Sequence, residues 1–182
     1  MIITKLLGVA AASVILLTGQ AATASASPEH EGHHSHGLAT VRAATDKYHS
    51  LARAKHDGYG LLTDVNGISC IADDDMGAMG YHYVRSDLVG DPAIVPTKPE
   101  ALVYAPDRHG RLHLAAVEYV VVKAAWDATH HSPPKLFGQT FNFTDAPNRY
   151  GLPPFYSLHV WLFKANPAGL FAMFNPNVHC PA

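Results

Sequence analysis

Four ionisable residues stand inside apolar stretches of the chain, where a charge is unusual. His82 lies between two tyrosines, Glu118 lies in the run Ala-Ala-Val-Glu-Tyr-Val-Val-Val, and His159 lies in Ser-Leu-His-Val-Trp-Leu-Phe. Glu100 opens a further apolar stretch, Glu-Ala-Leu-Val-Tyr, directly after a proline. A carboxylate in such surroundings is costly unless it is paired, hydrogen-bonded or bound to a metal ion. These four residues are therefore the candidates for chemistry.

Two imidazoles and two carboxylates form a donor set that suits a divalent metal ion: zinc, manganese, iron or copper. We expect His82, Glu118 and His159 as metal ligands, with Glu100 as a fourth ligand or as a catalytic general base. An ion with an open coordination position activates water or polarises a substrate oxygen. The leading hypothesis is a secreted metal-binding domain directed at a small-molecule substrate or ligand, and it leaves open whether the protein is an enzyme.

A second hypothesis, from a different class, is a non-catalytic secreted module that binds a ligand or a protein. A histidine in a strand is more often a hydrogen-bonded core residue than a ligand, and Glu118 could pair with Arg111, Lys123 or Arg149. The presence of several such residues favours a shared site, because buried polar groups need partners and these residues can partner one another or one ion. Some of five aromatic residues could line that site, since strand alternation allows only part of the set to face it: Tyr81, Tyr83, Tyr104, Tyr119 or Trp161.

Two further groups of residues could bind metal without the set of His82, Glu100, Glu118 and His159. The segment SPEHEGHHSHG at residues 27–37 holds four histidines, and such tracts capture zinc, copper or nickel. Metal scavenging by this tail alone is a third hypothesis. Met76 and Met79, followed by His82, have a spacing that could hold cuprous copper through thioethers, although loop and core packing is the commoner role of such methionines.

One helix and four strands are predicted to position these residues. Residues 38–57 repeat apolar residues at helical spacing, and Arg42/Asp46 and Arg53/Asp57 are oppositely charged i,i+4 pairs. Four segments are rich in β-branched or aromatic residues and are bounded by turn-forming residues. They span residues 80–84, 100–104, 111–122 and 156–164, with weaker strands expected at 61–63 and 169–174.

The fold class that follows is α+β. One amphipathic helix should pack on a mostly antiparallel sheet, which could curl toward a barrel. Residues 59–79 are mostly loop. Residues 125–155 carry many prolines and glycines and are too long for a tight hairpin, so we expect a lid or a surface loop there, with a short helical turn near residues 124–129.

The two ends of the chain indicate export. Lys5 precedes a dozen apolar residues, and the segment ends in Ala24-Ser25-Ala26, which is typical of a cleaved secretory signal and too short to cross a bilayer. We therefore expect a signal peptide at residues 1–26, a disordered histidine-rich tail at 27–37 and a single domain at 38–182. The protein would be secreted or extracytoplasmic, with no membrane contact after cleavage.

Composition and cysteine usage agree with a secreted globular domain. Hydrophobic residues make up 48% of the chain and charged residues 15%, with a formal net charge of −2, which argues against a nucleic-acid partner. The two cysteines, Cys70 and Cys180, are expected to form one disulfide in an oxidising compartment. Without a Cys-x-x-Cys spacing, a role as soft metal ligands is the lesser alternative. The oligomeric state is not indicated.

Several stretches resemble a family of exported bacterial proteins of uncharacterised function. The stretches are Met79-Gly-Tyr-His-Tyr-Val84, Lys98-Pro-Glu-Ala-Leu-Val-Tyr104, Val117-Glu-Tyr119, Leu158-His-Val-Trp161, Asn166-Pro-Ala-Gly169 and Asn175-Pro-Asn177. The resemblance covers most of residues 38–181 and implies an exported single α+β domain, without an activity. Cupins, which are secreted barrels with His and Glu ligands, differ clearly. They carry a His-x-His pair with a Glu a few residues on, whereas here the partners of His82 would lie far down the chain.

Overall fold

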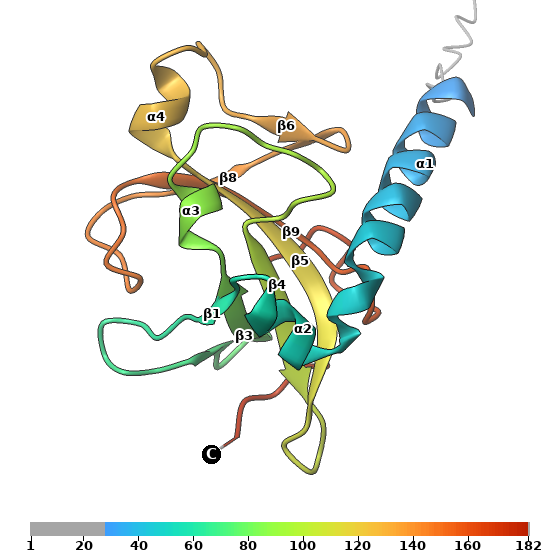
Figure 1. The fold of residues 1–182 in the computed structure, drawn as a ribbon, viewed down its shortest axis with the longest axis vertical. Coiled ribbons are helices and arrows are strands. Elements are labelled where there is room, and N and C mark those ends of the chain that lie inside the picture. Colours follow the sequence, from blue (N-terminus) through green and yellow to red (C-terminus); the bar gives the residue numbers. More distant parts are fainter. Residues whose placement is uncertain (1–27, 182) are drawn as a thin grey trace, which may run out of the picture.

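The structure is a computed structural model that describes residues 28–181, with side chains described from residue 36 onward. It combines a helical N-terminal segment with one large antiparallel sheet (Figure 1). The predicted signal peptide at residues 1–26 lies outside the described residues. None of the helices in the described part has the length and apolar character that crossing a membrane requires.

The N-terminal segment is helical over a longer stretch than the sequence predicts. Helix α1 spans Pro28–Thr45, a 3₁₀ turn follows at Asp46–His49, and α2 spans Leu51–His56. The predicted disordered tail at 27–37 is therefore corrected: from Pro28 onward its backbone belongs to α1. Proline at the first helical position and acidic residues in the first turn both favour a helix start, which the histidine-rich composition obscured.

The predicted single helix at residues 38–57 is interrupted at Ser50. This residue has an extended backbone (φ −85°, ψ 106°), and its Oγ accepts a hydrogen bond of 3.3 Å from the amide of Arg53. Serine is a favoured N-cap because its side chain satisfies an amide that the first helical turn leaves unpaired. One amphipathic pattern therefore continues across two helices.

The main sheet has the strand order β1-β3-β4-β5-β9-β8, with β2 paired to β3, and every pairing is antiparallel. Its strands are β1 (Gly60–Leu61), β2 (Cys70–Asp73), β3 (Gly77–Val84), β4 (Ala101–Pro106), β5 (Leu112–Val122), β8 (Asn142–Thr144) and β9 (Phe155–Val160). The sheet is open. The expected curl into a barrel does not occur, because β1 and β8 at its ends are too short to pair along a closing seam.

The four main strands were predicted close to their observed positions, and they form β3, β4, β5 and β9. The expected strand at residues 169–174 is absent; that segment runs in turns. The long segment 125–155 is only partly loop, because it contains β8 and a small hairpin. The remaining short elements are α3 (Ser86–Val89), α4 (Lys123–Asp127), β6 (Lys135–Leu136) and β7 (Gln139–Thr140).

The sheet separates two groups of buried side chains. The helix face, as we name it, packs against Val41, Tyr48 and Ala54 of the helical segment. Its sheet residues include Tyr83, Leu102, Tyr104, Val117 and Tyr119. The opposite face, which we name the cluster face, carries a smaller apolar core of Ala78, Val103, Ala105, Ala116, Trp161 and Val178. His82, Glu118 and His159 belong to the cluster face by strand alternation.

The C-terminal segment is attached to the β2–β3 end of the sheet. The predicted disulfide is confirmed: Cys70 and Cys180 are bonded, with their Cα atoms 5.7 Å apart. Ala78 and Asn175 exchange two backbone hydrogen bonds of 3.2 and 3.1 Å. Gly77 is required beside them, because a Cβ there would lie 2.4 Å from the Asn175 carbonyl oxygen.

Candidate metal centre

Strand register brings the three candidate ligands to one region of the cluster face. Glu118 on β5 is directly opposite His159 on β9, and on its other side it is opposite Ala101 of β4. Ala101 in turn is opposite Val84 of β3, two residues from His82. Since side chains alternate between faces, His82 and Val84 point to the same side as Glu118.

Small residues allow the two imidazoles to meet above the intervening strands. Three strand spacings of ~4.8 Å would separate β3 from β9 by about 14 Å in a flat sheet. The Nε2 atoms of His82 and His159 are nevertheless only 3.2 Å apart. The sheet positions between them carry Ala101, Val103 and Ala116, whose short side chains leave space for the rings.

The three side chains approach one another closely, and His159 faces Glu118 through Nδ1 and His82 through Nε2, so the short distances do not all belong to one set of donor atoms. Glu118 Oε2 is 3.5 Å from His82 Nε2, and Glu118 Oε1 is 3.3 Å from His159 Nδ1. Two donors bound at ~2.1 Å to a tetrahedral ion lie about 3.4 Å apart. One donor atom from each of the three residues can be chosen so that all lie within 4.8 Å of one another.

The cluster is buried, and no lysine or arginine among the described residues pairs with it. The exposed fractions of His82, Glu118 and His159 are 3%, 8% and 2%. The alternative that an arginine or lysine neutralises Glu118 is not supported, because the three candidates pair with other carboxylates. Arg111 pairs with Asp107, Lys123 with Asp127 and Arg149 with Asp64. Among the described residues, only the two imidazoles are ion-pair partners of Glu118.

Burial shifts all three groups toward their neutral forms. It lowers the pKa of His82 to about 4, an effect that the negative charge of Glu118 opposes. It lowers the pKa of His159 to about 4 as well. Burial raises the pKa of Glu118, while His82 and the Ser157 hydroxyl act in the opposite direction. Both imidazoles are therefore neutral near pH 7, which is the form that binds metal.

Each imidazole has a buried nitrogen without a hydrogen bond. Nδ1 of His82 and Nδ1 of His159 have no partner of ordinary hydrogen-bonding geometry, although the latter lies near Glu118. A buried polar atom left in this state costs about 1–3 kcal/mol. Nδ1 of His159 faces Glu118 and is available to an ion there, whereas His82 turns its Nε2 toward the other two residues.

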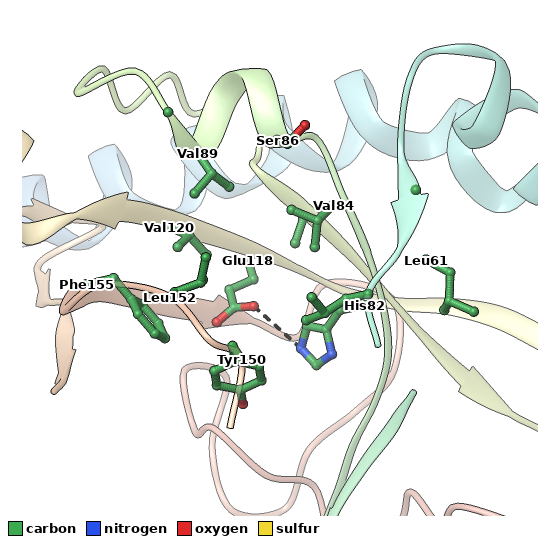
Figure 2. A pocket seen from close by; sticks show the side chains of 14 residues that line it. Leu61, His82, Val84, Ser86, Val89, Glu118, Val120, Tyr150, Leu152 and Phe155 are labelled. Atoms are coloured by element: carbon green, nitrogen blue, oxygen red, sulfur yellow. Dashed lines mark ion pairs between the residues drawn. The ribbon is translucent and has the colours of Figure 1, made fainter. Parts of the chain in front are cut away.

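An apolar pocket opens onto this cluster (Figure 2). Its volume is about 430 Å³, which is within the range of small-molecule sites. Figure 2 shows His82 and Glu118 pointing toward one another, with Tyr150 next to them. The surrounding walls are mostly aliphatic and include Leu61, Leu62, Val84, Val89, Val120, Leu152 and Phe155.

The wall that carries Tyr150 is fixed to the segment that follows β1, and Leu61 and Leu62, at the end of that strand, line the same pocket. Arg149 donates two hydrogen bonds, of 3.0 and 2.7 Å, to Oδ2 of the buried Asp64. The Arg149 carbonyl accepts a third bond, of 2.9 Å, from the amide of Val65. Burial, with a contribution from Glu118, raises the pKa of Tyr150 to about 12, so its phenol remains protonated.

Glu100, the expected fourth ligand or general base, is not in the cluster. Its Oε2 accepts a hydrogen bond of 3.0 Å from the backbone amide of Val120. Since β4 begins at Ala101, opposite Glu118, that amide lies beyond the end of the β4 ladder. Pro99 supplies no substitute, because its carbonyl accepts from the Tyr59 hydroxyl at 2.8 Å. Glu100 thus completes the backbone hydrogen bonding of β5.

The expected aromatic lining is replaced by other residues. Tyr81, Tyr83, Tyr104 and Tyr119 are not in the pocket wall, and they pack in the core of the helix face. Trp161 lies on the cluster face, stacked on His159 with ring centroids 6.3 Å apart. Met79 is buried with its sulfur 3.9 Å from the Tyr150 hydroxyl, and Met76 is half exposed.

The pocket residues that sequence reasoning missed come from segments whose apolar residues have neither helical nor strand periodicity. Tyr150, Leu152 and Phe155 follow the Asp-Ala-Pro-Asn turn region, and only the expectation of a lid at 125–155 pointed toward them.

Comparison of the chain with family models, curated proteins and solved structures gives no match. The resemblance to exported bacterial proteins therefore stays a prediction.

Proposed function

We propose that this protein is an extracytoplasmic metal-binding domain, with one divalent ion held by His82, Glu118 and His159 at the base of an apolar pocket. The observation that carries the proposal is the meeting of two imidazoles and a carboxylate from three strands, with one donor atom of each within 4.8 Å of the others, in a buried site that has no basic partner among the described residues. The disulfide supports an oxidising compartment.

A metal ion accounts for the cluster better than hydrogen bonding alone. Without an ion, His82 and His159 face each other through nitrogens, of which only one can donate if the pair shares a hydrogen bond. Nδ1 of His159 has Glu118 Oε1 at 3.3 Å but makes no hydrogen bond of ordinary geometry. An ion would give each ring a strong partner and would hold Glu118 in its ionised form despite burial.

The donor set favours zinc or ferrous iron. Two histidines and one carboxylate are the ligands of one class of catalytic zinc site and of the facial triad of non-haem iron proteins. In both, three protein ligands leave a position for water or a small molecule. Here His82 and Glu118 also line the pocket, so the open position would face it.

Metal content of the purified protein tests the proposal. We expect about one equivalent of ion per chain by elemental analysis after equilibration with zinc or with ferrous iron under anaerobic conditions. His159→Ala and Glu118→Gln should each reduce the affinity by at least about tenfold, which corresponds to 1.4 kcal/mol. His113→Ala is the matched control, because His113 lies on β5 but is exposed and pairs with Asp107.

A second variant separates this site from the histidine-rich segment. Replacing His30, His33, His34 and His36 with asparagine should leave the stoichiometric ion in place. If that variant loses the ion while His159→Ala retains it, the metal belongs to the N-terminal histidines and the proposed centre does not exist.

A further inference from the structure

The charge of the occupied site would be incomplete without a further anion. A divalent ion with two neutral imidazoles and one carboxylate keeps a net charge of +1. The three ligands are at least 92% buried, and a charge in such a place is costly unless it is neutralised. Glu118 is the only acidic residue in the described pocket wall. The described wall of the pocket therefore does not supply the missing negative charge.

The pocket wall limits how much negative charge a ligand can carry. The described residues that form it include no lysine or arginine. The nearest arginine in sequence to Tyr150 is Arg149, which is held by Asp64. A phosphate or a polycarboxylate would bring more charge than the ion can balance, whereas a single carboxylate would balance it fully.

The rest of the pocket is suited to a hydrocarbon group. Val84 and Val120 extend the cluster face beyond His82 and Glu118, and Val89 of α3 and Leu152 close the pocket around them (Figure 2). Leu61, which is 47% exposed, lies at the wall formed by β1. Burying an apolar chain here would contribute by the hydrophobic effect in proportion to the buried area.

We propose that the pocket binds a small monocarboxylate with an apolar tail, whose carboxylate coordinates the ion while the tail fills the aliphatic pocket. This inference rests on the proposed function, since it needs the ion of His82, Glu118 and His159. It adds a ligand class to that function: an amphiphile with one negative charge, rather than a sugar, a phosphate ester or a cation.

Calorimetric titration of the zinc-loaded protein with octanoate tests the inference, with octylamine and citrate as comparison probes. We expect octanoate to bind at one site and the other two to bind at least about tenfold more weakly. Removing zinc with a chelator should weaken octanoate binding by a similar factor. Val89→Trp and Leu152→Trp should abolish octanoate binding while zinc content stays at one equivalent, whereas Val95→Trp, outside the pocket, should change neither.

The outcomes separate the two proposals. If the protein holds zinc but octanoate does not bind, or octylamine binds equally well, the ligand class is wrong and the metal centre stands. If octanoate binds equally with and without zinc, the coordination of its carboxylate is refuted. If no ion is retained by the unaltered protein, the proposed function fails and the ligand proposal fails with it.

Discussion

The two faces of the sheet treat their buried polar atoms differently. On the helix face, three tyrosine hydroxyls donate to backbone carbonyls: Tyr104 to Tyr48 at 2.6 Å, Tyr119 to Pro96 at 2.6 Å and Tyr59 to Pro99 at 2.8 Å. On the cluster face, His82 and His159 each keep an unpaired buried nitrogen. The same strands therefore support a satisfied core on one side and an unsatisfied cluster on the other.

The difference is expected if the helix face serves stability and the cluster face serves the proposed binding of an ion. A closed hydrogen bond from a tyrosine fixes a loop or helix against the sheet and leaves no capacity for a ligand. A buried carboxylate that is paired only with neutral imidazoles costs stability in the free protein, and an ion between these groups would offset that cost. Glu100 belongs with the first kind, because its carboxyl group accepts a hydrogen bond from the backbone of β5.

The largest expected effect concerns the segment that covers part of the cluster face. Replacing both Cys70 and Cys180 with serine opens a loop of 110 residues and should lower the free energy of unfolding by about 3–5 kcal/mol. Urea unfolding followed by circular dichroism measures this loss. Amides of β2 and β3 should lose more hydrogen-exchange protection than those of α1 and α2. Equal losses of protection in the strands and in the helices would show that the two faces are not separately anchored.

Replacing the three clustered residues with apolar ones should raise the free energy of unfolding instead of lowering it. The triple change His82→Leu, Glu118→Met and His159→Leu removes the unpaired atoms, and the metal-free protein should gain about 1–4 kcal/mol of stability. The measurement is urea unfolding in the presence of a chelator. Zinc at 100 times its dissociation constant should stabilise only the unaltered protein, by about 2.7 kcal/mol. A triple variant that is less stable than the metal-free parent would mean that the cluster is structural.

Glu100 gives a prediction about pH that is separate from the cluster. Burial raises the pKa of its carboxyl to about 8, against an ordinary value of 4.5. Between these values the unfolded state is ionised while the folded state keeps its proton, so stability falls as pH rises, by at most about 1.4 kcal/mol per unit.

The variant Glu100→Gln isolates this contribution. It retains an acceptor for the Val120 amide and cannot ionise, so its stability should exceed that of the parent increasingly from pH 5 to pH 8. Thermal unfolding across this range, in the presence of a chelator, provides the measurement. Parallel pH profiles for the two proteins would show that Glu100 is ionised in the folded state throughout.

The sequence predicted the parts of the site that depend on strand periodicity. His82, Glu118 and His159 were identified because each interrupts a strand whose other residues are apolar, and strand boundaries shifted by only a few residues. Glu100 met the same criterion and is not in the cluster. The difference is its position before the start of β4, where a side chain can reach a backbone amide that the ladder leaves unpaired.

The pocket could not be predicted, because its walls are assembled by tertiary contacts. Tyr150 reaches the cluster through the Arg149–Asp64 ion pair, which joins residues 85 positions apart. The tyrosines that were expected to line the site fill the helix face instead. Alternation alone specifies which residues share a side, and it does not specify which side the helices cover.

The smallest expected effect is seen when one tyrosine hydroxyl of the helix face is compared with one of the pocket wall. Tyr104→Phe removes a buried hydrogen bond of 2.6 Å and should cost about 0.5–1.5 kcal/mol of unfolding free energy. Tyr150→Phe removes a hydroxyl whose only described contact of this kind is the Met79 sulfur at 3.9 Å, so stability should change by less than about 0.5 kcal/mol. Urea unfolding of both variants measures the difference. If Tyr150→Phe costs as much as Tyr104→Phe, the pocket wall is as tightly bonded as the core, and the contrast between the two faces does not extend beyond the three clustered residues.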